Sequence, residues 1–159
     1  MLVVKFIVAV VVFKMKYLAN LKNYMTNTSL IKNRNKVKQV VDFTGVQNGL
    51  IHPSDIDGVL EFDNKILILI EVKRRFKRIP PGQRLLLERL CDAWHDNEKS
   101  IVLKVEHEFD DENIDIPLEQ CKVTRVYYKK HWVTLPKKED FKYYLNRLGK
   151  TWDCEKCKF

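Results

Sequence analysis

The chain has 159 residues, enough for one domain with a substantial core and too few for two of ordinary size. Its 45% hydrophobic and 31% charged residues are typical of a globular protein and argue against a disordered chain. The net charge of +8 arises entirely in residues 1–41, which hold eight Lys or Arg and no acid, whereas the remainder holds 21 bases and 21 acids.

Residues 1–13 are apolar except for Lys5, and their longest uninterrupted apolar run is eight residues. A membrane-spanning helix needs about 20 apolar residues, so we expect no membrane association. We interpret residues 1–14 as a peripheral strand or as a non-native start that precedes a natural Met15. An export signal is a third reading, which lacks the expected cleavage site.

The predicted single domain covers residues 15–150, and apolar residues spaced by three and four predict a helix over residues 16–25. The basic segment Lys32–Lys38 indicates either a solvated face or an arm that contacts phosphates. Residues 40–44 follow as a strand or the end of a helix.

Two strands joined by a turn are predicted next. Gly58–Phe62 is rich in strand formers, Asp63–Lys65 is a turn signal, and Ile66–Lys73 begins with apolar residues that lack helical periodicity. Such a run is typical of a central strand buried on both faces, where Glu71 has no structural use.

A three-residue loop would pair Phe62 with Ile66 and bring Asp57 opposite Glu71. Lys73 would share the face of Glu71, because side chains alternate along a strand. A two-residue turn would shift the register and separate the two acids. The interpretation of this stretch as a site therefore requires an odd loop or a bulge.

Two carboxylates at the end of a buried strand repel each other and lose solvation unless a cation neutralises them. Oxygen ligands with open positions suit Mg²⁺ or Mn²⁺. An ion held by Asp57 and Glu71 would polarise a phosphoryl oxygen and acidify a water, and Lys73 could orient that water or offset charge in the transition state. The pattern indicates phosphodiester hydrolysis.

A helix is predicted over Gln83–Trp94, after the break at Pro80–Gly82, with Leu86, Leu87, Leu90 and Trp94 buried. Cations lie between the strand and this helix, and they indicate either a phosphate site or a solvated loop. They are Arg74, Arg75, Lys77, Arg78 and Arg84.

The chain resembles the PD-(D/E)XK nuclease superfamily in Asp57, the Glu71-Val72-Lys73 tripeptide and Gly82-Gln83. The local sequence around these residues is similar to that of small nuclease-like proteins of phages and prophages. The resemblance covers roughly residues 42–128. It implies an α/β fold with a restriction-endonuclease-like core, in which helices flank a mixed central β-sheet. It also implies metal binding by Asp57 and Glu71, assistance to the attacking water by Lys73, and ordering of the site by Gln83.

The chain departs from the family pattern in two respects. The proline that often precedes the family's aspartate is followed here by two candidates, and Asp55 is the alternative ligand to Asp57 or its supporting partner. The chain also has no acid before Asp42, so either the site holds a single metal ion or Asp42 contributes.

The remaining elements are predicted as a strand over 100–109, an acidic turn at 110–113, one or two strands over 121–135 and a closing helix over 136–148. Cys91 and Cys121 are predicted core residues, which favours a reducing compartment. The tail of residues 151–159 contains Cys154 and Cys157 in CxxC spacing; we expect a frayed end, with a zinc site or redox chemistry as alternatives.

We therefore expect a Mg²⁺- or Mn²⁺-dependent deoxyribonuclease that processes phage or prophage DNA in the cytoplasm of a bacterium or infected host. A homodimer is one option, because cutting both strands often needs two active sites. A non-catalytic nucleic-acid-binding protein on the same scaffold is the alternative. A third reading is an interaction module in which Glu71 and Lys73 form a buried ion pair.

Overall fold

The computed structural model of the protein describes residues 45–46, 53–111 and 114–159. The chain divides into two compact units, residues 1–50 and 51–159, and every helix and strand described below belongs to the second unit. Some predictions concern segments outside the described residues: the N-terminal segment 1–14, the helix over 16–25, the basic segment Lys32–Lys38, the element at 40–44 and Asp42 as a ligand.

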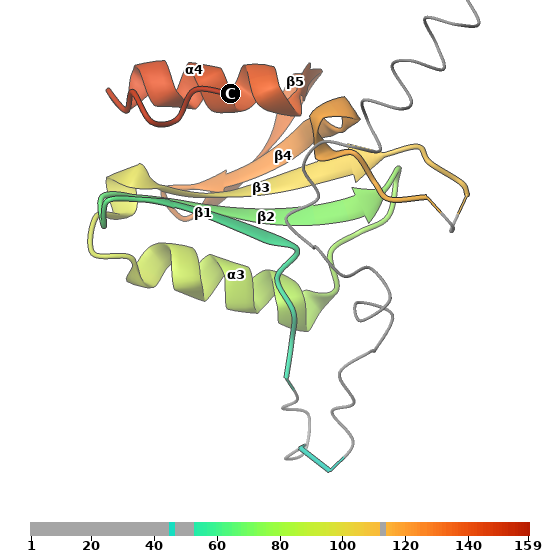
Figure 1. The fold of residues 1–159 in the computed structure, drawn as a ribbon. Coiled ribbons are helices and arrows are strands. Elements are labelled where there is room, and N and C mark those ends of the chain that lie inside the picture. The colour runs from blue at the N-terminus through green and yellow to red at the C-terminus, as the bar shows by residue number, and fades with distance from the viewer. Residues whose placement is uncertain (1–44, 47–52, 112–113) are drawn as a thin grey trace, which may run out of the picture. The chain divides into compact units, whose positions relative to one another are not determined.

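The second unit is an α/β structure with a mixed five-stranded sheet, as expected. Its strands, in spatial and chain order, are β1 (Gly58–Phe62), β2 (Ile66–Arg74), β3 (Ser100–His107), β4 (Lys122–Tyr128) and β5 (His131–Asp140). Only β2 and β3 are parallel, and helix α3 (Pro81–Ala93) connects them. Helix α4 (Phe141–Thr151) follows β5, and Figure 1 shows α3 and α4 on opposite faces of the sheet. No helix of the described residues has the length and apolar character needed to cross a membrane.

Each face of the sheet carries its own apolar core. On β2, Ile68 and Ile70 belong to the core beneath α4, whereas Leu67 and Leu69 belong to the core beneath α3. Because side chains alternate along a strand, Glu71 follows Leu69 onto the α3 face. The buried helix side chains of the two cores are Leu87 and Cys91 of α3, and Phe141, Tyr144, Leu145 and Leu148 of α4.

The register predicted for the β1–β2 hairpin is confirmed. Phe62 pairs with Ile66, and the three-residue loop between them is closed by a 2.9 Å hydrogen bond from the Lys65 N–H to the Phe62 carbonyl. The pairing continues to Gly58 opposite Ile70. The odd loop that the site requires is therefore present.

The predicted buried side of α3 is partly wrong. Only Leu87 of the four predicted residues is fully buried, and Leu90 is 40% exposed. Gln83 and Cys91 occupy the buried positions one turn before and one turn after Leu87. This stripe faces the sheet, so the helix begins with a buried polar side chain.

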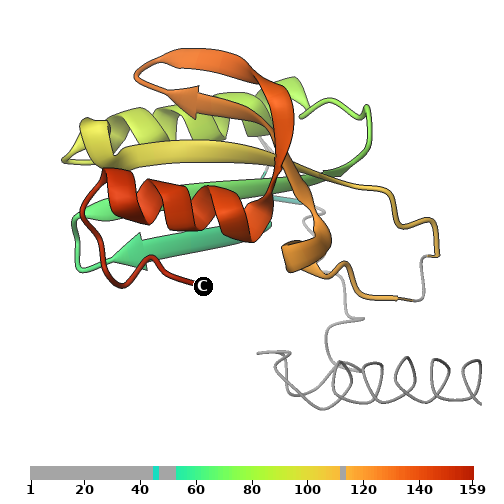
Figure 2. The same ribbon diagram turned by 90° about the horizontal axis from the view of Figure 1, so that it is seen from above.

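The predicted start of the closing helix is wrong. Pro136 lies inside β5, which extends to Asp140, and α4 begins only at Phe141. Proline is tolerated there because β5 is an edge strand, where a missing N–H need not interrupt the ladder. The predicted buried face of this helix is confirmed. Figure 2, a view from above, shows the red helix α4 in front of the sheet.

The C-terminal tail packs against α4, which contradicts the expected frayed end. The Cys154 N–H donates to the Gly149 carbonyl at 2.8 Å, and the buried Cys157 thiol donates to the Leu145 carbonyl at 3.3 Å. A Cβ on Gly149 would overlap the Cys157 carbonyl oxygen, so this close approach requires glycine. All four cysteines are free thiols.

Candidate active site

Glu71 is the buried centre of the candidate site. It is 0% exposed and follows a run of buried apolar residues on β2. Lys73 Nζ forms an ion pair with Glu71 Oε1, yet among the described residues no well-aligned hydrogen bond reaches either carboxylate oxygen of Glu71. Burial raises the pKa of the Glu71 carboxyl, the ammonium of Lys73 opposes this shift, and repulsion by Asp57 and Asp55 adds to it. A buried carboxylate whose only polar partner in the described part of the chain is one ammonium group is costly and is a candidate functional group.

Asp57 lies immediately before β1 and beside the end of β2. Its Oδ2 accepts a hydrogen bond of 2.7 Å from the Val72 N–H, so the side chain is held between the backbone positions of Glu71 and Lys73. Asp57 itself is exposed. Solvent exposure therefore increases across the site, from the buried Glu71 through the half-buried Lys73 to Asp57 at the surface.

Gln83 connects helix α3 to the segment that carries the aspartates. Its side-chain amide donates to the Asp55 carbonyl at 3.2 Å and to Asp55 Oδ1 at 3.3 Å. Gln83 is 9% exposed whereas Asp55 is exposed, so this contact is partly shielded from water. The structure thus brings Asp55, Asp57, Glu71, Lys73 and Gln83 together around the carboxyl end of β2 and the start of α3.

Two further buried charges on β3 were missed by the sequence analysis. Lys104 is 6% exposed and Glu106 9%, and Lys104 Nζ lies 2.6 Å from Glu106 Oε1. In the parallel register, Lys104 is opposite Glu71 and Glu106 is opposite Lys73. Lys138 of β5 completes the cluster, with its Nζ 3.1 Å from Glu106 Oε2. We call Lys104, Glu106 and Lys138 the β3 charge cluster.

The alternating pattern of the predicted strand over 100–109 already placed Lys104 and Glu106 on one face. Nothing in the sequence showed that this strand pairs in parallel with β2, because that pairing depends on the crossover through α3. The sequence therefore showed that Lys104 and Glu106 share a face, but it did not show that β2 is the neighbouring strand.

Most of the predicted phosphate-binding cations already have acidic partners. Arg75 Nη1 lies 2.8 Å from Glu108 Oε1, and Arg84 Nε lies 2.6 Å from Glu88 Oε1. Arg74 pairs with Asp110. The exposed Lys77 and Arg78 form no ion pair with any described residue. Exposed ion pairs are worth about 0–1 kcal/mol each, so a phosphate can replace such a partner at little cost.

The chemistry of the acids suits a hard divalent cation, although the geometry is not that of a complete cage. Among the described residues, no three His, Cys, Asp or Glu side chains gather as a metal-binding group. Glu71 Oε2 has no ion-pair partner there, and Asp57 Oδ2 is engaged by the backbone. Two carboxylates with open positions are common in Mg²⁺ sites, where water and phosphate oxygens complete the coordination.

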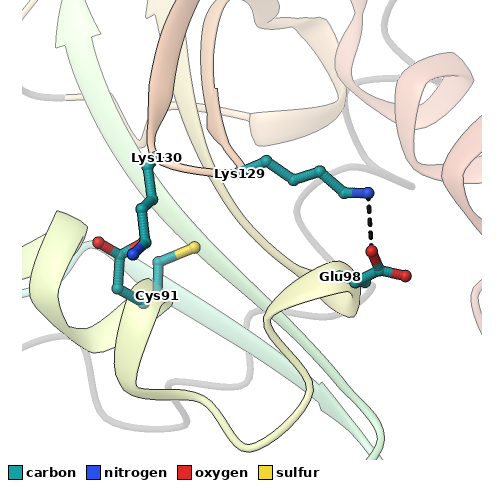
Figure 3. A pocket seen from close by; sticks show the side chains of 5 residues that line it. Cys91, Glu98, Lys129 and Lys130 are labelled. Atoms are coloured by element: carbon teal, nitrogen blue, oxygen red, sulfur yellow. Dashed lines mark hydrogen bonds and ion pairs between the residues drawn. The ribbon is translucent and has the colours of Figure 1, made fainter.

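A pocket of about 220 Å³ lies at the opposite end of α3. Figure 3 shows Lys129 directed at Glu98, with which it forms a 2.9 Å ion pair, and Lys130 beside the helix end that carries Cys91. Burial raises the pKa of the Cys91 thiol, which keeps it protonated and unreactive. None of the predicted site residues lines this pocket.

Searches of protein-family models, curated proteins and solved structures find no match to this chain. Fold and site therefore define the class from geometry alone: an α/β protein in which a buried Glu-Lys pair and two aspartates meet where a central strand ends and a helix begins.

Proposed function

We propose that the protein is a Mg²⁺- or Mn²⁺-dependent nuclease that hydrolyses DNA phosphodiester bonds on a restriction-endonuclease-like core. The observation that carries the proposal is the fully buried Glu71, which lacks well-aligned hydrogen bonds and lies beside Lys73 and Asp57. Burial of a carboxylate is costly and one ion pair offsets that cost only in part, whereas a bound divalent cation would neutralise the acids that meet here. The resemblance to the PD-(D/E)XK superfamily gives the same roles to the same residues.

Glu71 and Asp57 would hold the cation, and Asp55 is the alternative ligand. When bound, a divalent cation stabilises charge on a phosphoryl oxygen and lowers the pKa of a coordinated water. Lys73 is a proton-donating cation beside Glu71, so it can orient the attacking water and offset charge in the transition state. Gln83 supports this arrangement by holding Asp55 against α3.

The cations after β2 would bind the phosphates on either side of the scissile bond. Lys77 and Arg78 are exposed, and Arg74 and Arg75 can exchange their exposed acidic partners for phosphates. Arg84 pairs with Glu88, whose side chain is only 19% exposed, so this exchange would cost more. Such contacts carry little sequence information, so we expect binding to many sequences. The proposed role is the processing of phage or prophage DNA in the cytoplasm of a bacterium or infected host.

Cleavage is tested by incubating the protein with supercoiled, linear, branched and single-stranded DNA in Mg²⁺, Mn²⁺ or EDTA. We expect products with either metal and none in EDTA. The isosteric Glu71→Gln variant should be inactive, whereas Glu155→Gln on the exposed tail should cut normally. Equal activity of wild type and Glu71→Gln would show that any cleavage comes from a contaminant or another site.

Metal binding has a test that does not depend on activity. Mn²⁺ should raise the melting temperature of the wild type, because a ligand that binds only the folded state stabilises it by about 2.7 kcal/mol at 100 times its dissociation constant. Glu71→Gln and Asp57→Asn should abolish this shift. Absence of any shift in the wild type would remove the cation from the proposal.

A non-catalytic nucleic-acid-binding protein is the second candidate. The observations that favour it are the ion pair between Lys73 and Glu71 and the lack of a three-ligand group among the described residues. It predicts DNA binding that survives Glu71→Gln, with no cleavage by the wild type on any substrate. The incubation series therefore separates the two functions.

A further inference from the structure

Phe76 is the most exposed large hydrophobic side chain of the described residues, at 78% exposure. It lies in the turn that follows β2, which is closed by a 2.9 Å hydrogen bond from the Lys77 N–H to the Arg74 carbonyl. Only two residues separate it from Lys73 of the candidate site. An aromatic ring in such a turn contributes almost nothing to the core.

The backbone of Phe76 is also strained. Its φ of 66° lies in the left-handed region, which a turn position of this kind normally fills with Gly or Asn. A bulky residue there costs stability, and such outliers gather at functional sites. Phe76 is therefore exposed and strained at once, so its presence calls for a role outside folding.

Two cations lie against the Phe76 ring. The Arg75 guanidinium carbon is 4.6 Å from the ring centroid, and Lys138 Nζ is 5.7 Å from it. Both cations also contact acids, Arg75 through Glu108 and Lys138 through Glu106. An exposed ring with cations beside it is the combination that holds a nucleotide of a single strand, because the base stacks on the ring and the cations meet its phosphates.

The ring is linked to the candidate site through the β3 charge cluster. Lys138 reaches from the Phe76 ring to Glu106, and Glu106 is opposite Lys73 in the parallel register. A hollow of about 270 Å³ lies beside this link and is lined in part by Glu106, Glu108 and Lys138. The hollow thus gives an unstacked base room beside Lys138, one of the two cations that contact the ring.

We propose that Phe76 is a stacking platform for an unpaired base and that the site accordingly takes DNA with an unpaired nucleotide beside the scissile phosphate. Single strands, flaps and branches meet this requirement, and a continuous duplex does not, because its bases are already stacked. The inference rests on the proposed nuclease function, which explains why a DNA strand would lie beside Phe76.

The probe is an oligonucleotide with 2-aminopurine as its unpaired base, supplied as a single strand, as a flap and as a fully paired duplex. Binding is measured in EDTA, so that cleavage does not interfere. We expect the wild type to quench the fluorescence of the single strand and flap and to bind both more tightly than the duplex. Removing a stacked ring weakens binding by about 5- to 150-fold.

Phe76→Gly is the decisive variant, because glycine accepts the left-handed backbone and removes only the ring. This variant should no longer quench the probe, and its affinity for the single strand and the flap should fall by the factor given above for a stacked ring. Its affinity for the duplex should not change, and its melting temperature should be no lower than that of the wild type. Phe76→Trp should restore both signals. Tyr143→Ala, which removes a 63% exposed ring from α4, is the matched control and should change nothing.

Unchanged binding and quenching in Phe76→Gly would overturn the inference, as would equal losses on all three probes or a wild type that prefers the duplex. The first of these results would leave a protein partner as the remaining reason for an exposed ring. If the wild type quenches the flap probe but never cuts it, the proposed nuclease activity is wrong and the stacking role of Phe76 stands. If Phe76→Gly cuts all substrates as the wild type does, the stacking role of Phe76 is wrong and the proposed nuclease activity stands.

Discussion

Glu71 of β2 lies directly opposite Lys104 of β3 in the only parallel pair of the described sheet, and both side chains are buried. The ammonium of Lys104 nevertheless bonds to Glu106 on its own strand. Glu71 is left with Lys73 as its single cationic partner among the described residues. The candidate site and the β3 charge cluster are thus adjacent but separately neutralised, and they can be tested separately.

Lys104→Met should destabilise the protein by about 3 kcal/mol. Removing one partner of a buried ion pair leaves an uncompensated charge, and the loss lies at the low end of the usual range because Lys138 still reaches Glu106. Urea unfolding measures the difference. The matched control is Lys122→Met, which breaks an exposed pair with Asp140 and should cost about 0–1 kcal/mol. Equal costs for the two variants would contradict the buried position of Lys104.

The stability of the β3 charge cluster should depend on pH in the acid range. Burial acts to raise the pKa of Glu106, but hydrogen bonds from Lys104 and Lys138 outweigh it and hold the pKa below its ordinary value of 4.5. The folded protein therefore binds fewer protons here than the unfolded chain. The contribution is fully present above about pH 4.5 and is lost as the pH falls through the folded pKa.

Unfolding free energies of the wild type and Glu106→Gln, measured between neutral and acid pH, check this sign. The gap between the two proteins should be widest at neutral pH and should narrow as the solution is acidified. Glu155→Gln on the exposed tail should follow the wild type throughout. A gap that widens on acidification would reverse the assignment.

Glu71→Gln and Lys73→Ala should abolish cleavage and leave DNA affinity nearly unchanged. The surrounding Lys and Arg side chains contact phosphates and supply the affinity, whereas Glu71 and Lys73 act on the scissile bond. Single-turnover cleavage and binding in EDTA give the two readouts. A Lys73→Ala protein that cuts at the wild-type rate would remove the role assigned to this lysine.

Replacement of Arg75, Lys77 and Arg78 together by alanine should reduce the salt dependence of binding. Each neutralised phosphate contributes about 0.9 to the slope of log affinity against log salt on duplex DNA, so the slope should flatten by roughly two to three units. Affinity should fall evenly across sequences. An unchanged slope would mean that these side chains only solvate a loop and would redirect the search to Lys32–Lys38.

The matched control for this experiment replaces three cations away from the candidate site. Lys129 and Lys130 form the β4–β5 turn at the other end of the sheet, and Lys150 lies on α4. The triple alanine variant of these lysines has the same change in net charge. Its slope should remain close to that of the wild type, which separates a local phosphate path from general attraction.

Several features of this protein were determined by local sequence alone. Alternation reduced the hairpin to two registers, and the three-residue loop selects the one that places Asp57 beside Glu71, because a hairpin register depends only on the loop and its two flanking strands. The periodicity of Phe141, Tyr144 and Leu148 likewise identified the buried face of α4 without any knowledge of its partner strands.

Only the tertiary structure decided which elements meet across long stretches of chain. Lys104 stands next to Glu71 because the α3 crossover makes β3 the parallel neighbour of β2, a pairing that no local pattern specifies. Pro136 is tolerated within β5 because β5 is an edge strand of the sheet. Cys157 is buried because Gly149, which has no side chain, leaves room for it. The strain at Phe76 is of the same kind: the sequence offers an ordinary aromatic residue, and the closure of the turn between Arg74 and Lys77 forces it into the left-handed region.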